Sequence, residues 1–243
     1  MKNPLKIDIL TSKFENLFGI NPNEVKKTCV LLPLTPKGLL KILGIEKLTR
    51  AGLYASSQTE NATVICTGMG AGLVGDALLY LGETPCQNIV LFGSCGAISK
   101  KLPTGSLVTP KKSLNLESFS DWLFDDNPSP RELFPDKTLS TYLEDFYKDQ
   151  NIRIVNCATV GSLKLEEERH VWLAKNDIDV VDMECSGLFS ASKKCALKAL
   201  ALFYVSDVIK KKPFYLPDSN NLPMMDAIYN VLFSLIKMIS QQV

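Results

Sequence analysis

Two acidic residues, separated by one methionine, end an apolar run in the segment VVDMECSGLF, residues 180–189. An unpaired buried carboxylate is costly, so acids at the end of a buried strand need something to face. A carboxylate can accept hydrogen bonds from two adjacent hydroxyl groups, and a methionine side chain can pack against the apolar face of a sugar ring. We therefore expect Asp182 and Glu184 to face a sugar, with Glu184 on the diol and Met183 against the ring.

A third acid ends another apolar run, ALALFYVSD, residues 199–207, where Asp207 directly follows Ser206. A carboxylic acid next to a pocket of low dielectric constant can protonate or hydrogen-bond a departing base. The alternative is that Asp207 only caps the segment that follows it.

Two glycine-rich turns follow strand-like runs. In TGMGAG, residues 67–72, the turn at Gly68, Met69 and Gly70 opens a predicted helix, so its backbone N–H groups can approach an anion. The turn lacks the Lys-Ser/Thr of a nucleotide P-loop, and a simple tight turn is the alternative. In FGSCGA, residues 92–97, Ser94 offers a hydroxyl group where a β-bulge would also explain the glycines. Together with the acids, these turns describe a site where an anion or water attacks a sugar bonded to a leaving group.

The elements that must position these residues alternate along the chain. Uninterrupted apolar runs typical of strands covered on both faces occur at 28–34, 62–70, 88–96, 105–110, 152–160, 178–184 and 199–207. Helical patterns lie between or after them at about 37–44, 71–82, 137–149, 165–175, 184–196 and 223–241. This alternation predicts one α/β domain, residues 1–243, with a largely parallel central sheet. Ligands of such sheets collect beyond the carboxyl ends of the strands.

The composition argues against several classes of protein. The 27 basic and 26 acidic residues leave a formal net charge of +1, which gives no field to gather nucleic acid or an anionic membrane. The chain has no long apolar segment and no recognisable leader, so we expect a cytoplasmic protein with no membrane contact. The seven cysteines are an odd number without CxxC spacing, and His170 is the only histidine. Reduced thiols and no metal site are therefore expected.

The combination of TGMGAG, LFGSCGAI, GSLVTP, VVDMECSGLF and VSD, in this order and approximate spacing, resembles the nucleoside phosphorylase/nucleosidase superfamily. The resemblance covers about residues 28–240. It implies a three-layer α/β/α phosphorylase-type fold, a small-molecule nucleoside as the binding partner, and a homo-oligomer such as a dimer or hexamer.

The resemblance also implies roles for individual residues. Glu184 matches the glutamate that holds the ribose diol, Met183 the sugar-packing methionine, and Asp207 the aspartate that acts on a purine. Ser94 and the turn of Gly68, Met69 and Gly70 match positions that hold phosphate or the attacking water, and Arg50 matches an arginine donated across a subunit interface. The implied base-binding positions are Cys95, Gly96, Leu163, Ser206 and Phe214.

The sequence departs from the family where the attacking group would bind. The Gly-Asp-Pro segment and its arginine are absent from CVLLPLTPKG, and Leu91 stands at a second arginine position of the phosphorylases. The acid with which the nucleosidases activate water is also absent, and Phe203 stands where they have an arginine. Glu15, which lies upstream of the first strand, could replace that acid only if its segment folds back onto the site. Phosphorolysis and hydrolysis thus both stay open. No cofactor is expected, with inorganic phosphate as a possible co-substrate.

Two other functions were weighed against cleavage of the N-glycosidic bond of a purine-like nucleoside. The missing residues at the nucleophile position fit a catalytically reduced relative that binds a nucleoside or base as a sensor. A dinucleotide-binding oxidoreductase fits the sheet but not the glycines, because Gly68, Gly70 and Gly72 alternate and no acid ends a strand about twenty residues later.

Overall fold

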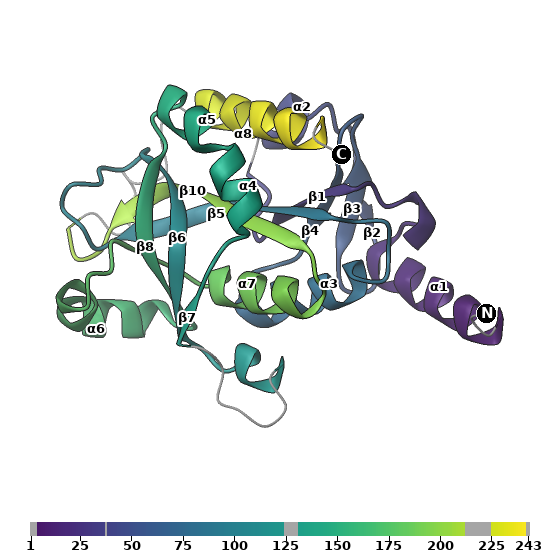
Figure 1. Ribbon diagram of the computed structural model, residues 1–243, viewed down its shortest axis with the longest axis horizontal. Coiled ribbons are helices and arrows are strands. Elements are labelled where there is room, and N and C mark those ends of the chain that lie inside the picture. The colour runs from purple at the N-terminus through teal and green to yellow at the C-terminus, as the bar shows by residue number, and fades with distance from the viewer. Residues whose placement is uncertain (1–3, 37, 124–130, 212–224, 242–243) are drawn as a thin grey trace.

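A computed structural model describes residues 4–36, 38–123, 131–211 and 225–241. Within these residues the strands form one mixed sheet (Figure 1) in the order β10-β6-β8-β9-β5-β1-β4-β3-β2, with β7 paired to β6. The strands are β1 (Thr28–Leu32), β2 (Thr49–Arg50), β3 (Ala55–Gln58), β4 (Thr63–Cys66), β5 (Asn88–Ala97), β6 (Leu107–Leu116), β7 (Glu132–Leu133), β8 (Arg153–Val160), β9 (Val180–Asp182) and β10 (Lys198–Val208).

One part of the sheet closes on itself. Strand β10 pairs with β6 and also with β5, so β10, β6, β8, β9 and β5 form a ring from which β1, β4, β3 and β2 extend. The α/β fold with a largely parallel sheet is confirmed, and the sheet is mixed rather than purely parallel. Strand β9 runs antiparallel to β5, β6 runs antiparallel to β10, and β3 is antiparallel to both of its neighbours.

Helices cover both faces of the sheet, as Figure 1 shows. The helices are α1 (Pro4–Phe18), α2 (Leu39–Ile42), α3 (Ala71–Leu81), α4 (Lys137–Tyr142), α5 (Glu144–Asp149), α6 (Leu163–Lys175), α7 (Cys185–Lys194) and α8 (Met225–Ser240). Alternate residues of β1 serve the two faces: Leu31 packs with α1, α3 and α7, whereas Leu32 packs with α2, α4, α5 and α8. This arrangement explains why the strand is apolar at every position.

The predicted helices and the seven predicted strands are all present, with shifts at their ends. Helix α8 is amphipathic as expected and buries Ile228, Leu232 and Ile239, among others. Helix α1 and the short strands β2, β3 and β7 were not predicted from the sequence. Helix α1 is held by Phe18, whose ring stacks on Tyr54 with 4.4 Å between the centroids.

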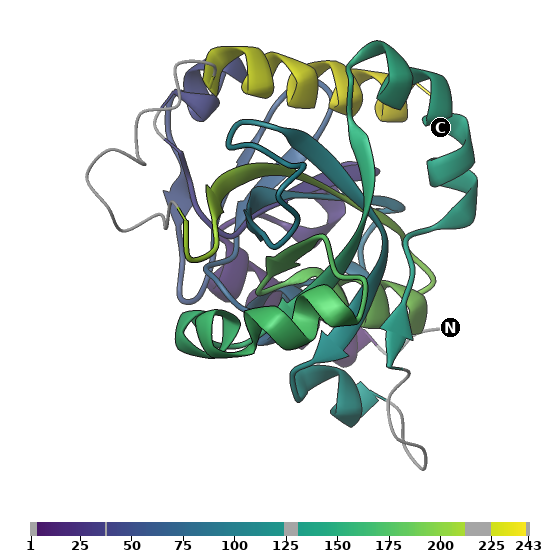
Figure 2. The same cartoon turned by 90° about the vertical axis from the view of Figure 1, so that its left-hand side faces the viewer.

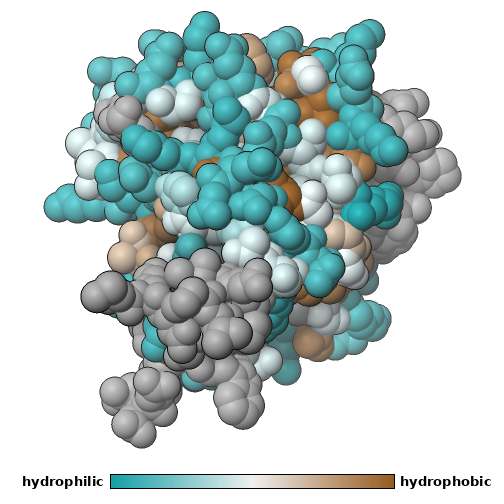
Figure 3. All heavy atoms as spheres, turned by 90° about the vertical axis from the view of Figure 1, so that its right-hand side faces the viewer, coloured by the Kyte–Doolittle hydropathy of each residue, from teal (hydrophilic) through white to brown (hydrophobic). Residues whose placement is uncertain are grey.

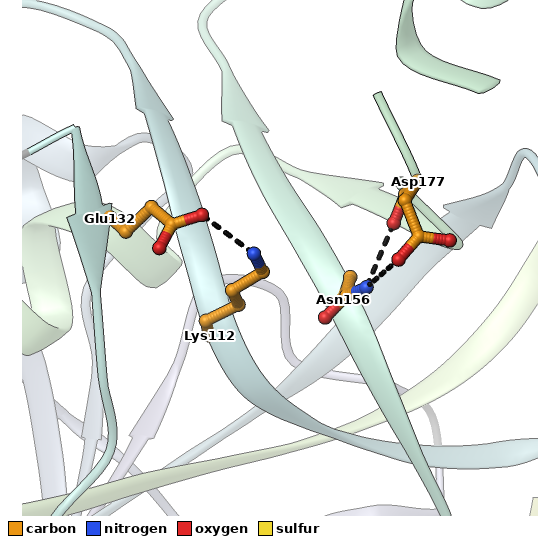
Figure 4. Close-up of polar contacts among 4 residues, drawn as sticks. All are labelled: Lys112, Glu132, Asn156 and Asp177. Carbon is orange, nitrogen blue, oxygen red and sulfur yellow. Dashed lines mark hydrogen bonds and ion pairs between the residues drawn. The ribbon is translucent and has the colours of Figure 1, made fainter. Parts of the chain in front are cut away.

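Polar contacts fix two connections at the ring end of the sheet (Figure 4). The Asn156 side chain on β8 donates from Nδ2 to the backbone oxygen of Asp177 at 2.9 Å and to its carboxylate at 2.8 Å. Lys112 on β6 pairs with Glu132 on β7 at 2.6 Å. The first contact ties the turn after α6 to the sheet and so fixes where α6 lies.

The surface is largely hydrophilic on the face shown in Figure 3, and the cysteines form no disulfide among the described residues. On the face shown in Figure 3, hydrophilic side chains surround small separate apolar areas. All seven cysteines are free, and five of them are buried. Among the described residues, no helix is long and apolar enough to cross a membrane.

Candidate active site

Strand pairing brings the predicted site residues together at the ring end of the sheet, which faces the viewer in Figure 2. Gly96 on β5 pairs with Val181 on β9 on one side and with Asp207 on β10 on the other. Because β9 runs antiparallel to β5, the chain after Val181 runs back alongside Cys95 and Ser94. The segment of Met183 and Glu184 therefore reaches the site from the opposite direction to that expected for a parallel sheet.

Asp182 does not face a ligand, which corrects the expectation that both acids of this segment face a sugar. Its carboxylate accepts hydrogen bonds from the backbone N–H groups of Glu184 and Cys185, at 3.0 and 2.6 Å, and from the Thr159 hydroxyl at 2.8 Å. Burial raises the pKa of Asp182 to about 6, and these hydrogen bonds oppose the rise. Asp182 thus holds the start of α7, and with it Glu184, in place.

Glu184 joins two motifs that lie far apart in the sequence. Its carboxylate accepts a hydrogen bond of 2.7 Å from the backbone N–H of Gly70, and the residue is 5% exposed. Burial raises the pKa of Glu184 to about 8, the Asp182 charge adds to the rise, and the Gly70 N–H opposes it. The backbone of Gly70 has a φ of +107° and that of Gly68 a φ of +80°, which glycine adopts without strain. The glycine turn and Glu184 are therefore in direct contact.

Asp207 lies at the end of β10, where a bulge at Ser206 shifts the register. The Ser206 hydroxyl lies 2.7 Å from the Asp207 carboxylate, to which it donates, and 3.2 Å from the backbone oxygen of Cys95. Burial raises the pKa of Asp207, and the hydrogen bond from Ser206 opposes that rise. A carboxyl group that is buried and held by one hydroxyl suits proton donation.

Three other predicted residues lie close to these acids along the chain or across the sheet: Met183 directly follows β9, and Ser94 and Gly96 lie on β5. Met183 and Ser94 are half-buried, and Met183 lies between the buried residues Asp182 and Glu184. Gly96 is closely packed, because a Cβ there would lie 3.2 Å from the Ile209 side chain and 3.4 Å from that of Val181.

Glu166 belongs to this region although the sequence analysis did not select it. It lies in the first turn of α6, is 7% exposed, and feels the negative charges of Asp207, Asp182 and Glu184. Leu163, selected from the same segment, is 48% exposed. Three consecutive glutamates at 166–168 give no signal in the sequence as to which one is turned inwards. Phe214 lies outside the described residues.

The nucleophile half of the site is open by comparison. Met69 in the glycine turn is 55% exposed, and Arg50 is exposed on the edge strand β2. The positions where relatives would carry other arginines hold Leu91 and Phe203, both of which are fully buried in the core. Glu15 is exposed on α1 and accepts a hydrogen bond from Asn21 at 2.7 Å, so it does not fold back into the site.

A buried polar cluster lies behind the site. Ligand-type atoms of Cys157, Asp182 and Cys185 lie within 4.8 Å of one another. The Cys157 thiol lies 3.4 Å from the Asp182 carboxylate, which the Thr159 hydroxyl and the two N–H groups at the start of α7 also reach. The carboxylate is therefore satisfied by the protein itself.

Comparison with known proteins gives a consistent family and fold. A family model described as the phosphorylase superfamily matches residues 44–217. No curated protein matches the chain at a significant level. Among solved structures, the fold matches uridine phosphorylase from Vibrio fischeri with a TM-score of 0.73 and 17% identity, covering 91% of this chain and 94% of that one.

Two nucleosidases are also similar in fold. AMP nucleosidase from Bacteroides thetaiotaomicron matches with a TM-score of 0.71 and 14% identity, covering 96% of this chain and 99% of that one. The 5'-methylthioadenosine/S-adenosyl homocysteine nucleosidase from Campylobacter jejuni matches with a TM-score of 0.70 and 15% identity, over 88% and 99% of the two chains.

Proposed function

The chain belongs to the phosphorylase superfamily, and we propose that it is an enzyme that cleaves the N-glycosidic bond of a purine-like nucleoside, with water as the acceptor. The observation that carries this proposal is the carboxylate of Glu184 held on the N–H of Gly70, with Asp207 near the end of β10, on the other side of β5 from β9. This arrangement supports a sugar and a leaving base bound between the two acids.

The ribose is held by Glu184 and Met183. The Glu184 carboxyl group accepts the N–H of Gly70 and is also stabilised by the backbone of Met183, and its remaining lone pairs accept hydrogen bonds from the 2' and 3' hydroxyl groups. Met183 packs against the apolar face of the ring. As the bond to the base breaks, the sugar becomes oxocarbenium-like. This positive charge favours the ionised form of Glu184, whose fixed carboxylate stabilises the charge in turn.

The leaving base is neutralised by Asp207. Burial raises the pKa of Asp207, so this group stays protonated to a higher pH than an aspartic acid in water does. Donation of this proton to N7 of a purine removes the negative charge that would otherwise develop on the base. The preference for a purine-like base follows from this role, since a pyrimidine has no equivalent nitrogen.

Water suits this site better than phosphate. The carboxyl groups of Glu184, Asp207 and Glu166 lie in one region, and none of them offers a positive charge to a phosphate dianion. Gly70 donates its N–H to Glu184, so that donor is engaged. A guanidinium fork is the strong partner for phosphate, and Leu91 and Phe203 occupy the positions where relatives would carry one.

The open side of the site supports a homo-oligomer, a dimer or hexamer, as the working form. Burial raises the pKa of Cys66, and the charge of the nearby Arg50 opposes that rise. Cys66 is three residues before Met69, which is exposed. A second copy that covered this edge would bury Leu34 and Met69, which are 51% and 55% exposed. Sedimentation with and without the Met69→Glu substitution tests this assembly, since a like charge in the interface should shift the protein to the monomer.

The test of the proposed function is release of free base from a panel of purine and pyrimidine nucleosides, followed by chromatography. The native protein should release purine bases, and the near-isosteric variant Asp207→Asn should not. The variant Glu168→Gln, which changes an exposed residue of α6, serves as the control and should match the native rate. Thermal stabilisation by nucleosides without any base release would instead identify the chain as a binding protein.

A further inference from the structure

Helices α3 and α7 pack side by side on one face of the sheet (Figure 1), and the two partners of a contact in the site lie at their starts. Gly70 directly precedes α3 and donates its backbone N–H to Glu184, which directly precedes α7. The helices approach so closely that a Cβ on Gly187 would lie 2.4 Å from the backbone oxygen of Ala71. The place of the Glu184 carboxylate therefore depends on how α7 lies against α3.

Glu117, which follows β6, binds the first turn of α7. Its carboxylate accepts a hydrogen bond of 2.7 Å from the Ser186 hydroxyl. Ser186 is fully buried, lies two residues after Glu184, and donates its backbone N–H to the Thr159 hydroxyl at 2.8 Å. A hydrogen bond to a carboxylate is stronger than one between neutral groups, so this contact restrains the turn that carries Glu184.

The same carboxylate also binds a segment that packs on α3. It accepts the backbone N–H of Phe119 and, at 2.7 Å, the hydroxyl of Ser120, both in the 3-10 helix η2 (Phe119–Leu123). The Phe119 ring lies directly on α3, because a Cβ on Gly75 would lie 2.0 Å from the nearest ring atom. Glu117 is thus connected to α7 by one hydrogen bond and to α3 through the Phe119 ring.

Asp182 and Glu117 restrain the first turn of α7 in different ways. Asp182 lies on β9 and accepts the backbone N–H groups of Glu184 and Cys185, which fixes α7 to the sheet. Glu117 instead fixes α7 to η2 and, through the Phe119 ring, to α3. The second restraint is the one that sets where Glu184 meets the glycine turn.

We propose that Glu117 is a positioning residue for the reaction, which acts through Ser186 to hold the Glu184 carboxylate at the glycine turn. Without this restraint α7 can shift against α3, and Glu184 then meets the ribose diol in a less favourable position. A misplacement of about 1 Å in a site is enough to slow a reaction strongly. This inference rests on the proposed function and adds the residue that sets the geometry of the ribose contact.

An indirect role predicts a coupling that a purely structural role lacks. If Glu117 acts through Glu184, loss of the contact with Ser186 should have little effect in a protein that already lacks the Glu184 carboxylate. A residue that only stabilises the fold should lower the activity by the same factor whether or not that carboxylate is present.

The experiment is a double-mutant cycle on base release from a purine ribonucleoside, with Ser186→Ala, Glu184→Gln and the combined variant. Ser186→Ala removes the hydroxyl that Glu117 holds and leaves Glu117 its contacts with η2. It should lower kcat/KM about tenfold in the native protein, because the position of Glu184 is loosened. In the Glu184→Gln protein it should lower kcat/KM by less than about twofold. The Tm of each variant shows that it is folded at the assay temperature.

Glu117→Ala removes all the contacts of the carboxylate and should follow the same pattern, with a loss at least as large as that of Ser186→Ala. If Glu117→Ala does not fold, Ser186→Ala decides alone. The control is Ser192→Ala, a buried serine of the same helix whose hydroxyl donates within α7 to the backbone oxygen of Phe189 at 3.1 Å. Its kcat/KM should equal that of the native protein.

The positioning role is refuted if Ser186→Ala cleaves at the native rate, or if it loses the same factor with and without the Glu184 carboxylate. In either case, release of purine bases by the native protein leaves the proposed function standing. If the native protein binds nucleosides without cleaving them, the same cycle on the Kd decides between coupling and additivity. If it neither cleaves nor binds a nucleoside, both proposals fail together.

Discussion

The two halves of the site differ in how they are held. In the ribose and base half, Asp182, Glu184 and Asp207 are nearly fully buried, and each has a hydrogen-bond partner within the chain. In the nucleophile half, Met69 and Arg50 are exposed, and the position of a phosphate-binding arginine holds the core residue Leu91. A site that is organised around the leaving base and open around the acceptor suits a reaction in which bond breaking runs ahead of attack.

This difference predicts that substitutions in the ribose and base half lower the rate of base release the most, with the largest loss at Asp207. Asp207→Asn removes the proton donor while keeping the shape, so kcat should fall by about 10²–10⁴ with little change in KM. Steady-state kinetics on a cleaved purine nucleoside measures this. Equal turnover in the variant would mean that the base leaves without help from this residue.

Substitution of Glu184 should have the next largest effect on catalysis, and the size of this effect should depend on the sugar of the substrate. Replacement of the carboxyl group that holds the diol should lower kcat/KM for ribonucleosides by about 10–100-fold in Glu184→Gln. A 2'-deoxyribonucleoside lacks one of the hydroxyl groups, so the variant should lose less on that substrate. An identical loss on both sugars would place Glu184 away from the diol.

Substitution of Asp182 should lower the stability of the fold more than it lowers the rate of base release. Asp182→Asn removes a carboxylate that caps α7 and receives the Thr159 hydroxyl, which should cost about 1–3 kcal/mol in urea unfolding. The matched control is Asp136→Asn, a cap of α4 that accepts from the Leu139 N–H at 2.9 Å in a less buried setting. A cost for Asp182 no larger than that for Asp136 would contradict its proposed role in holding Glu184.

Stability should also depend on pH in a direction set by the buried half. The pKa of Glu184 and that of Glu166 are both raised to about 8, so in the folded state these groups keep their protons at pH values where the unfolded chain has lost them. The contribution of these two groups to the free energy of unfolding is present in full below about pH 4.5 and is lost as the pH rises through 8. The Tm should therefore fall between pH 5 and 8, and Glu184→Gln and Glu166→Gln should each flatten the curve. A rise of Tm over this range, unchanged by either substitution, would contradict the assignment.

The smallest effect on base release should come from the open half. If water is the acceptor, Arg50→Ala should change phosphate-free turnover by less than about threefold, since no phosphate has to be held. Arg169→Ala, an exposed change on α6, is the control. A loss comparable to that of Glu184→Gln would show that Arg50 takes part in the reaction.

The sequence predicted the elements better than the directions in which their side chains point. Apolar runs and helical spacing placed the strands of the ring and helix α8, and the glycine turn and Glu184 were expected at one site. Asp182 was assigned to the sugar because spacing alone does not show that the chain turns at once into α7, whose N–H groups take up that carboxylate. Glu166 was missed because its burial depends on the rotation of α6, whose sequence LKLEEERH has polar residues on all sides.

The most direct test of the account is to analyse the sugar product of a cleaved purine nucleoside with and without inorganic phosphate. The account predicts free ribose at a rate that does not depend on phosphate, because the nucleophile half has no guanidinium at the positions of Leu91 and Phe203. Ribose 1-phosphate, formed only when phosphate is present, would contradict it and would show that phosphate binds beside Glu184 after all.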